Sequence, residues 1–261
     1  MLLHAAEPAR SAGGFLGVDM LFVVAAALVT RGLLDPRHDG LRTAVGNLWS
    51  GMSKRWIPPL TLVLVWTSIY GRYIADGVSH RELGSDGVAS LLHVVNWRFA
   101  DTNEPISGVA DASLFHQLWS LAVAAQWLLL WLLVIALSRR IGASRRWRIA
   151  VGAAALAGAI ASVVAITAIF DTIEPARAFF GTDTRAVGLF LGAATAAAWP
   201  RVTRLAAVAT GWRSFVLPAL SAASLGGLAA LVASGDEGDA WLYRLGPLAA
   251  AVAAAVLLVA E

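Results

Sequence analysis

Asp19 is the residue of this sequence whose surroundings most favour a chemical role, because it lies inside the apolar run GGFLGVDMLFVV. An ionisable side chain at the centre of a bilayer costs roughly 2.5 to 3.5 kcal/mol and is retained mainly where it has a partner or a function. We predict that Asp19 belongs to a functional site, the alternative being a buried structural partner for an arginine.

His4 lies earlier in the chain. It could act near neutral pH as a general base, although a histidine close to a terminus is more often solvated.

Two further segments place polar side chains at the start of apolar runs. SLFHQLWSLAVAAQW carries His116 and Ser120 beside Trp119, a residue type that anchors helices at membrane interfaces. GTDTRAVGLFLGA carries Asp183 and Arg185 two residues apart. These side chains could line a substrate site. The alternatives are an aromatic anchor with simple helix capping in the first segment, and an ordinary interfacial ion pair in the second.

Motifs of soluble enzymes and of metal sites are absent from the sequence. It contains no G-x-x-x-x-G-K-[ST] loop, no H-E-x-x-H, no G-x-S-x-G elbow and no glycine-rich dinucleotide fingerprint. The five histidines share no metal-ligand spacing, and the lack of cysteine excludes thiolate ligands and cysteine catalysis. We therefore expect no bound metal ion and no bound cofactor.

The composition is typical of an integral membrane protein. Hydrophobic residues make up 58% of the chain and charged residues only 14%, whereas soluble domains carry about 25% charged residues. The 20 basic and 17 acidic residues give a net charge of +3, and the basic ones lie in loops, which argues against a nucleic-acid partner. We predict an all-α, polytopic, integral membrane helical bundle that crosses the plasma membrane several times and is surrounded by membrane lipids.

The helices that would position the candidate residues are apolar stretches long enough to cross a bilayer, which takes roughly 20 residues each. We predict about seven transmembrane helices, near residues 14–30, 56–75, 117–138, 149–170, 184–199, 214–233 and 241–260. Residues 87–99 are too short to span and are expected to lie at the interface. Arginines crowd alternate loops, such as the one from Arg139 to Arg148. These loops are predicted to be cytoplasmic, and the acidic segments between them to face outward.

Four segments, taken together and in this order, resemble the membrane acyltransferase-3 family. GGFLGVDMLFVVAAALVT resembles the family motif GGFxGVDxFFVLSGFLIT, and His4 precedes it where the family has an essential histidine. KRWIPPL, which begins at Lys54, is similar to R-R-x-x-R-I-x-P. HQLWSLAVAAQW is similar to H-x-W-S-L-x-x-E-x-Q-F, and GTDTRAVGLFLGA resembles G-T-D-T-R-x-x-x-L-L-x-G-A.

The resemblance implies a single acyltransferase-like transmembrane domain over residues 1–261, which O-acylates a hydroxyl of a cell-envelope glycan or lipid. His4 would then deprotonate the acceptor hydroxyl, and Asp19 would orient or charge-balance the catalytic site. Arg55 would attract the phosphates of the donor, acyl-CoA or another acyl carrier. The other substrate-binding residues that the resemblance implies are His116, Trp119, Ser120, Asp183 and Arg185.

The chain also departs from the family pattern. Ala124 and Ala125 stand where the family has glutamates, and Gly51 and Met52 stand at its leading arginine pair. Against the family pattern, we also expect the usual first-helix start and last helices to be lacking. These departures motivate a second hypothesis, a non-catalytic accessory subunit or a lipid or glycan passage that works with an envelope-biosynthesis protein. A secondary transporter is weaker, because the sequence shows no inverted repeats or paired broken helices.

Overall fold

The structure is a computed structural model that describes residues 15–35, 37, 40–75, 79–106, 112–141, 144–171, 173–208, 215–234 and 240–260, without the side chains of residues 144–145, 202–208, 216–217, 232–234 and 260. The regular elements in these ranges are all helical, which confirms the all-α part of the predicted fold class. In chain order they are α1 (Leu16–Leu34), α2 (Leu41–Tyr73), α3 (His80–Leu91), α4 (Val95–Asp101), the 3-10 turn η2 (His116–Leu118), α5 (Trp119–Arg139), α6 (Ser144–Ile169), α7 (Ala176–Phe180), α8 (Thr182–Arg185), α9 (Val187–Val208), α11 (Val216–Ser234) and α12 (Ala240–Ala260).

Four helices within the described ranges are long and apolar enough to cross a membrane. Their apolar segments are Leu16–Leu34, His116–Arg139, Arg146–Ile169 and Ala240–Val259. They match four of the predicted stretches, and a shorter apolar helix, Pro218–Leu231, lies in a fifth. The stretches expected in α2, α9 and α11 stay predictions as membrane spans.

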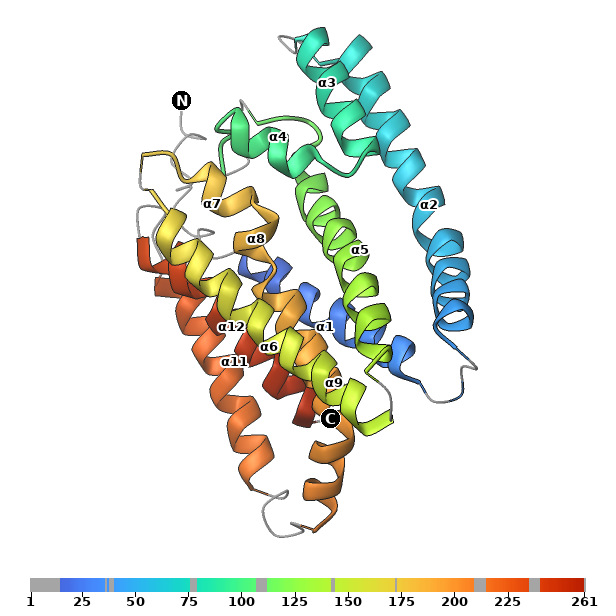
Figure 1. Ribbon diagram of the computed structural model, residues 1–261. Helices are drawn as coiled ribbons and strands as arrows, with labels where there is room; N and C mark the ends of the chain where they lie inside the picture. Colours follow the sequence, from blue (N-terminus) through green and yellow to red (C-terminus); the bar gives the residue numbers. More distant parts are fainter. Residues whose placement is uncertain are drawn as a thin grey trace.

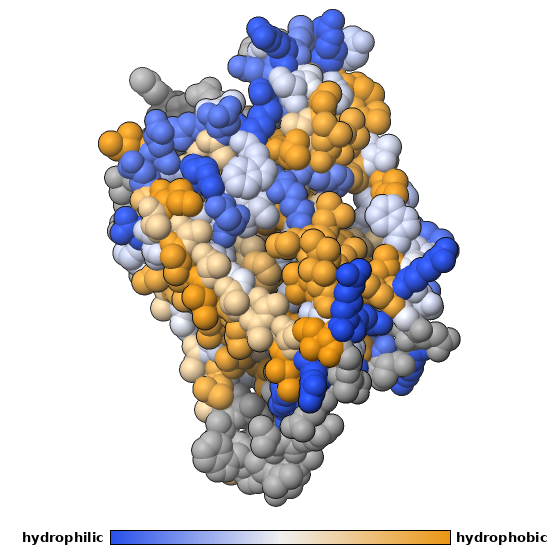
Figure 2. Space-filling view, in the orientation of Figure 1, coloured by the Kyte–Doolittle hydropathy of each residue, from blue (hydrophilic) through white to orange (hydrophobic). Residues whose placement is uncertain are grey.

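The long helices other than α2 form one bundle, and short helices gather at one end of it (Figure 1). We call this end, with α3, α4, α7 and α8, the acidic end, because Asp86, Asp101, Glu104 and Asp183 lie there or in the adjoining segments. Figure 2 shows hydrophilic residues over α4 and α7 and hydrophobic residues across the middle of the bundle. This distribution suits a bundle whose middle faces lipid.

The close packing of α1 on α9 depends on two glycines. A Cβ placed on Gly188 would lie 2.8 Å from the backbone oxygen of Asp19, and one placed on Gly192 would overlap the backbone oxygen of Val23. Small residues four apart allow two helix backbones to approach closely in a membrane. The same two glycines therefore bring the Asp19 turn of α1 against the beginning of α9.

Hydrogen bonds attach α1 to α5 and α6 at its other end. The indole Nε1 of Trp131 donates to the hydroxyl of Thr30 over 2.9 Å, and both side chains are buried. Arg139 and Arg148 donate to two backbone oxygens in the last turn of α1, at 2.9 Å and 2.5 Å. Carbonyls in the last turn of a helix have no partner within the helix. The two arginines thus fix where α1 ends.

Helix α2 stands apart from the bundle and packs mainly on α3 and α1 (Figure 1). Its buried residues are only Ala44, Leu64 and Gly71. The helix continues through Pro58 and Pro59, each of which removes a backbone donor. Its exposed side chains include many large apolar ones, which in a membrane protein face lipid without cost.

Candidate functional site

A buried ion pair joins two of the predicted site residues, Asp19 of α1 and Arg185 of α8. The carboxylate oxygen Oδ2 lies 3.2 Å from the guanidinium nitrogen Nη2, and the side chains are 0% and 1% exposed. The glycines of α9 bring the Asp19 turn close to the chain that follows Arg185. The sequence allowed two roles for Asp19, a functional group or a buried partner for an arginine. The structure shows that Asp19 has an arginine partner, and its functional role stays a prediction.

Aromatic rings surround the guanidinium group of Arg185. Its central carbon lies 5.3 Å from the ring centre of Phe15, 5.2 Å from that of Trp119 and 4.7 Å from that of Phe179. A cation over an aromatic face is attracted by the ring quadrupole, by about 2 kcal/mol where water is excluded. Trp119 is only 4% exposed, so it forms a wall of this site rather than the interfacial anchor that its type first indicated.

The ion pair is not completed by hydrogen bonds from the described residues. Both carboxylate oxygens of Asp19, and Nε and Nη2 of Arg185, are buried without a hydrogen-bond partner there. Taking charges out of water costs several kcal/mol per ion, and attraction offsets this only when the remaining polar atoms are also satisfied. The pair therefore has unused hydrogen-bonding capacity in an apolar setting. Buried polar atoms without partners are uncommon in folded proteins, and a catalytic role is one of the explanations for them.

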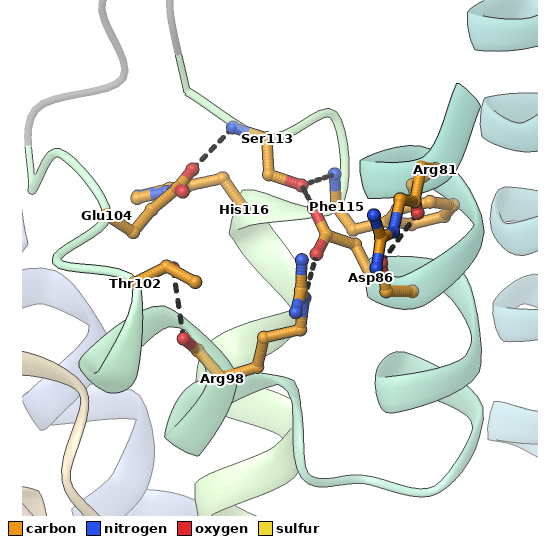
Figure 3. A network of polar contacts seen from close by, with 9 residues as sticks. Arg81, Asp86, Arg98, Thr102, Glu104, Ser113, Phe115 and His116 are labelled. Carbon is orange, nitrogen blue, oxygen red and sulfur yellow. Dashed lines mark hydrogen bonds and ion pairs between the residues drawn. The ribbon is translucent and has the colours of Figure 1, made fainter. Parts of the chain in front are cut away.

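His116 belongs to a second polar cluster at the acidic end (Figure 3). Its Nδ1 lies 3.9 Å from Oε1 of Glu104, and its ring packs between Phe99 and Phe180, with centroids 5.9 Å and 5.5 Å away. Phe180 also contacts Trp119 at 5.9 Å. Aromatic rings thus separate this cluster from the Asp19–Arg185 pair, so the sequence-predicted residues do not form one continuous polar site.

Hydrogen bonds tie the loop before α5 to α3 and α4 (Figure 3). The hydroxyl of Ser113 donates to Asp86 over 2.6 Å, and the backbone N–H of Ser113 donates to Glu104 over 2.5 Å. Asp86 also pairs with Arg98 at 2.5 Å. Sequence reasoning missed Asp86 and Glu104 as site residues, because it used them only as acidic charges for orientation.

Gln126 links α5 to α4 and to α8, the short helix that ends at Arg185. Its carboxamide oxygen accepts hydrogen bonds from Trp97 over 2.8 Å and from the hydroxyl of Thr182 over 2.6 Å. Its nitrogen donates to the side chain of Asn96 over 2.8 Å and to the backbone oxygen of His93 over 2.7 Å. Gln126 thus holds the first residue of α8 against α4 and α5. The sequence signal that could have identified Gln126 is its position, because a polar side chain within an apolar helix needs hydrogen-bond partners.

We expect Gln126→Leu to lower the free energy of unfolding by about 2 kcal/mol, because it removes several hydrogen bonds at once and leaves Thr182 without its acceptor. The measurement is the unfolding of the purified protein in detergent, compared between wild type and variant. Gln117→Leu is the matched control, since Gln117 is exposed in η2. Equal stability of the two variants would contradict the role of Gln126 as a connecting residue.

Asp183 pairs with Arg177 and not with Arg185. The contact is bidentate, at 3.0 Å and 2.8 Å, and both side chains are partly exposed. Burial alone would raise the pKa of Asp183, but the hydrogen bonds and charge of Arg177 outweigh it, and the pKa lies below its ordinary value. This contribution to stability is present above the ordinary pKa of aspartate and is lost as the pH falls through the lowered value.

The remaining predicted site residues lie apart from the buried pair or outside the described ranges. The hydroxyl of Ser120 donates to the backbone oxygen of Gln117 over 3.3 Å. Arg55 is exposed on α2, and no described contact links it to the buried pair. His4 lies outside the described residues. In the part of the chain that the structure describes, no group of three His, Cys, Asp or Glu side chains could hold a metal ion.

Comparison with curated proteins finds O-acetyltransferases. The chain is 28% identical to YrhL of Bacillus subtilis over 257 residues, which cover 94% of this chain and 38% of that protein. It is 28% identical over 249 residues to the peptidoglycan O-acetyltransferase OatA of Listeria monocytogenes, covering 94% and 39%. It is 28% identical over 243 residues to the O-acetyltransferase OatA of Staphylococcus aureus, covering 90% and 38%. The chain thus spans about two fifths of the length of these relatives. No family model and no solved structure matches.

Proposed function

We propose that this chain is the membrane domain of an O-acyltransferase that moves an acyl group to a hydroxyl of a cell-envelope glycan. The observation that carries the proposal is the buried, incompletely hydrogen-bonded pair of Asp19 and Arg185 within an aromatic shell. Its two residues come from the two segments that best resemble the acyltransferase-3 motifs. Two of the relatives are named peptidoglycan O-acetyltransferase and O-acetyltransferase, which supports a glycan acceptor and an acetyl group.

The proposed reaction divides between the two sides of the plasma membrane. The donor, acyl-CoA or another acyl carrier, approaches from the cytoplasm, where Arg55 attracts its phosphates. His4 takes the proton of the acceptor hydroxyl near the outer surface, and Asp19 orients or charge-balances the catalytic site. The chain crosses the membrane about seven times, with the arginine-rich loops inside and the acidic end outside. Membrane lipids surround it.

A specific observation favours the second candidate, a non-catalytic accessory subunit of an envelope-biosynthesis complex. Ala124 and Ala125 lie half-buried on α5, where the family motif has glutamates. An acidic partner for a catalytic histidine or an arginine is thereby removed from this helix. Under this candidate function the chain co-purifies with an envelope enzyme and transfers no acyl group by itself.

The test is mass spectrometry of envelope glycans from cells with and without the gene, complemented by wild type, His4→Ala or His80→Ala. We expect one acylated species to disappear with the gene and to return with wild type and with His80→Ala, but not with His4→Ala. His80 is the matched control because it is exposed on α3 and contacts Arg72 there. An acylation profile that does not depend on the gene would refute acyl transfer. Full activity of His4→Ala would refute the proposed base.

A further inference from the structure

The guanidinium group of Arg185 has more hydrogen-bond donors than the described residues use. Its side chain is 1% exposed, yet Nε and Nη2 lack a hydrogen-bond partner within the described ranges. Guanidinium presents five N–H donors in a rigid fork and stays charged in proteins. Oδ2 of Asp19 lies 3.2 Å from Nη2 but without hydrogen-bond geometry. Arg185 therefore has N–H donors left for an oxygen acceptor besides its contact with Asp19.

We propose that Arg185 is a catalytic residue whose N–H groups bind the carbonyl oxygen of the acyl group and stabilise the negative charge that develops on it. This inference rests on the proposed O-acyl transfer and assigns the chemical step in which the buried pair acts. Preorganised donors aimed at a developing oxyanion are usually the largest single contribution to catalysis in acyl transfer. A fixed cation in an apolar shell is such a donor.

The transfer step places the negative charge where Arg185 can neutralise it. The acceptor hydroxyl oxygen forms a bond to the acyl carbon of a thioester donor, and the electron pair of the C=O double bond moves onto the carbonyl oxygen. Arg185 donates hydrogen bonds to this oxygen. When the electron pair returns, the bond from the acyl carbon to the donor sulfur breaks. The proton of the hydroxyl passes to the base and then to the leaving thiolate, so the acylated acceptor and a free thiol result.

The surroundings of Arg185 favour this role over that of a simple structural cation. Phe15, Trp119 and Phe179 exclude water from around the guanidinium group, and electrostatic attraction to an oxyanion is stronger where water is excluded. Asp19 balances the charge of Arg185 before the substrate arrives. It also leaves the N–H of Nε unused. A purely structural pair would gain by using all of its donors.

The first experiment compares wild type with Arg185→Lys, which keeps a positive charge for Asp19 but loses the planar fork. Purified protein in lipid nanodiscs receives acetyl-CoA as donor and an N-acetylglucosamine oligosaccharide as acceptor. We expect kcat to fall about 100-fold, the effect of removing one oxyanion donor in other acyl-transfer enzymes, with little change in the KM for the acceptor. Arg201→Lys on the same helix bundle is the control, because Arg201 is exposed.

The second experiment separates oxyanion binding from a structural role. Arg185→Ala is assayed with and without millimolar guanidinium chloride, and its unfolding is followed under both conditions. We expect guanidinium to restore part of kcat in Arg185→Ala and to have no such effect on wild type. The inference is overturned if Arg185→Lys keeps its kcat within about threefold of wild type, or if folded Arg185→Ala is not rescued. If wild type itself transfers no acetyl group, the proposed function fails together with this inference. If wild type is active and the Arg185 variants give either of the two overturning results, only this inference fails, so the two failures are distinguishable.

Discussion

Replacing Asp19 alone by leucine is expected to destabilise the protein more than replacing Asp19 and Arg185 together. In the single variant the guanidinium group stays buried among aromatic rings with no anion beside it. Removing one partner of a buried pair costs about 3 to 5 kcal/mol, whereas replacing both by apolar residues is often close to neutral. We therefore expect Asp19→Leu to lower the free energy of unfolding by several kcal/mol, and Asp19→Leu/Arg185→Leu to recover most of that loss.

The measurement is the free energy of unfolding in detergent for wild type, both single variants and the double variant, together with acyl transfer by each. Transfer is expected to be lost in all three variants, because the double variant restores the fold but not the donors for the carbonyl oxygen. The exposed pair of Arg177 and Asp183 is the matched control for stability. Its removal should cost less than about 1 kcal/mol. A double variant as unstable as Asp19→Leu would contradict the electrostatic explanation.

The sequence predicted the fold class well because the signal is local. Each long apolar run has to satisfy its backbone groups internally, so it has to be a helix wherever it lies in the bundle. The boundaries of α2 were harder. The apolar run begins near residue 56, but the helix begins at Leu41 and continues through Pro58 and Pro59. Prolines are tolerated in such helices when the freed backbone groups find other partners, and this depends on three-dimensional context.

The candidate site was predicted by residue type but not by pairing. Asp19 was identified because charge is expensive in an apolar run, and Arg185 because it stands two residues from Asp183 at the start of one. The expected pairing of Asp183 with Arg185 is replaced by a contact with Arg177. Glu104 could not be found, since its contact with His116 depends on how residues before α5 return to α3 and α4. Local sequence fixes which groups need partners, and only the tertiary structure decides which partners they obtain.

Gly192→Ala is expected to disturb the site through the packing of α1 on α9. The added methyl group would overlap the backbone oxygen of Val23, one turn after Asp19 on α1. Because the neighbour is backbone and not a flexible side chain, the two helices have to move apart. Overpacking of this kind costs typically about 1 to 3 kcal/mol. The shift also draws Asp19 away from the start of α9, so we expect a loss of acyl transfer larger than the loss of stability alone would cause.

The comparison that isolates this effect is Gly226→Ala on α11, where an added Cβ meets nothing within 4 Å. Alanine has the higher helix propensity, by about 0.8 to 1.0 kcal/mol in peptides, so Gly226→Ala should be neutral or slightly stabilising. Gly188→Ala should resemble Gly192→Ala, since its Cβ would lie 2.8 Å from the backbone oxygen of Asp19. Unfolding in detergent and acyl transfer are measured for all three variants. If Gly192→Ala behaved like Gly226→Ala in both measurements, the close approach of α1 to α9 would not be what holds Asp19 beside Arg185.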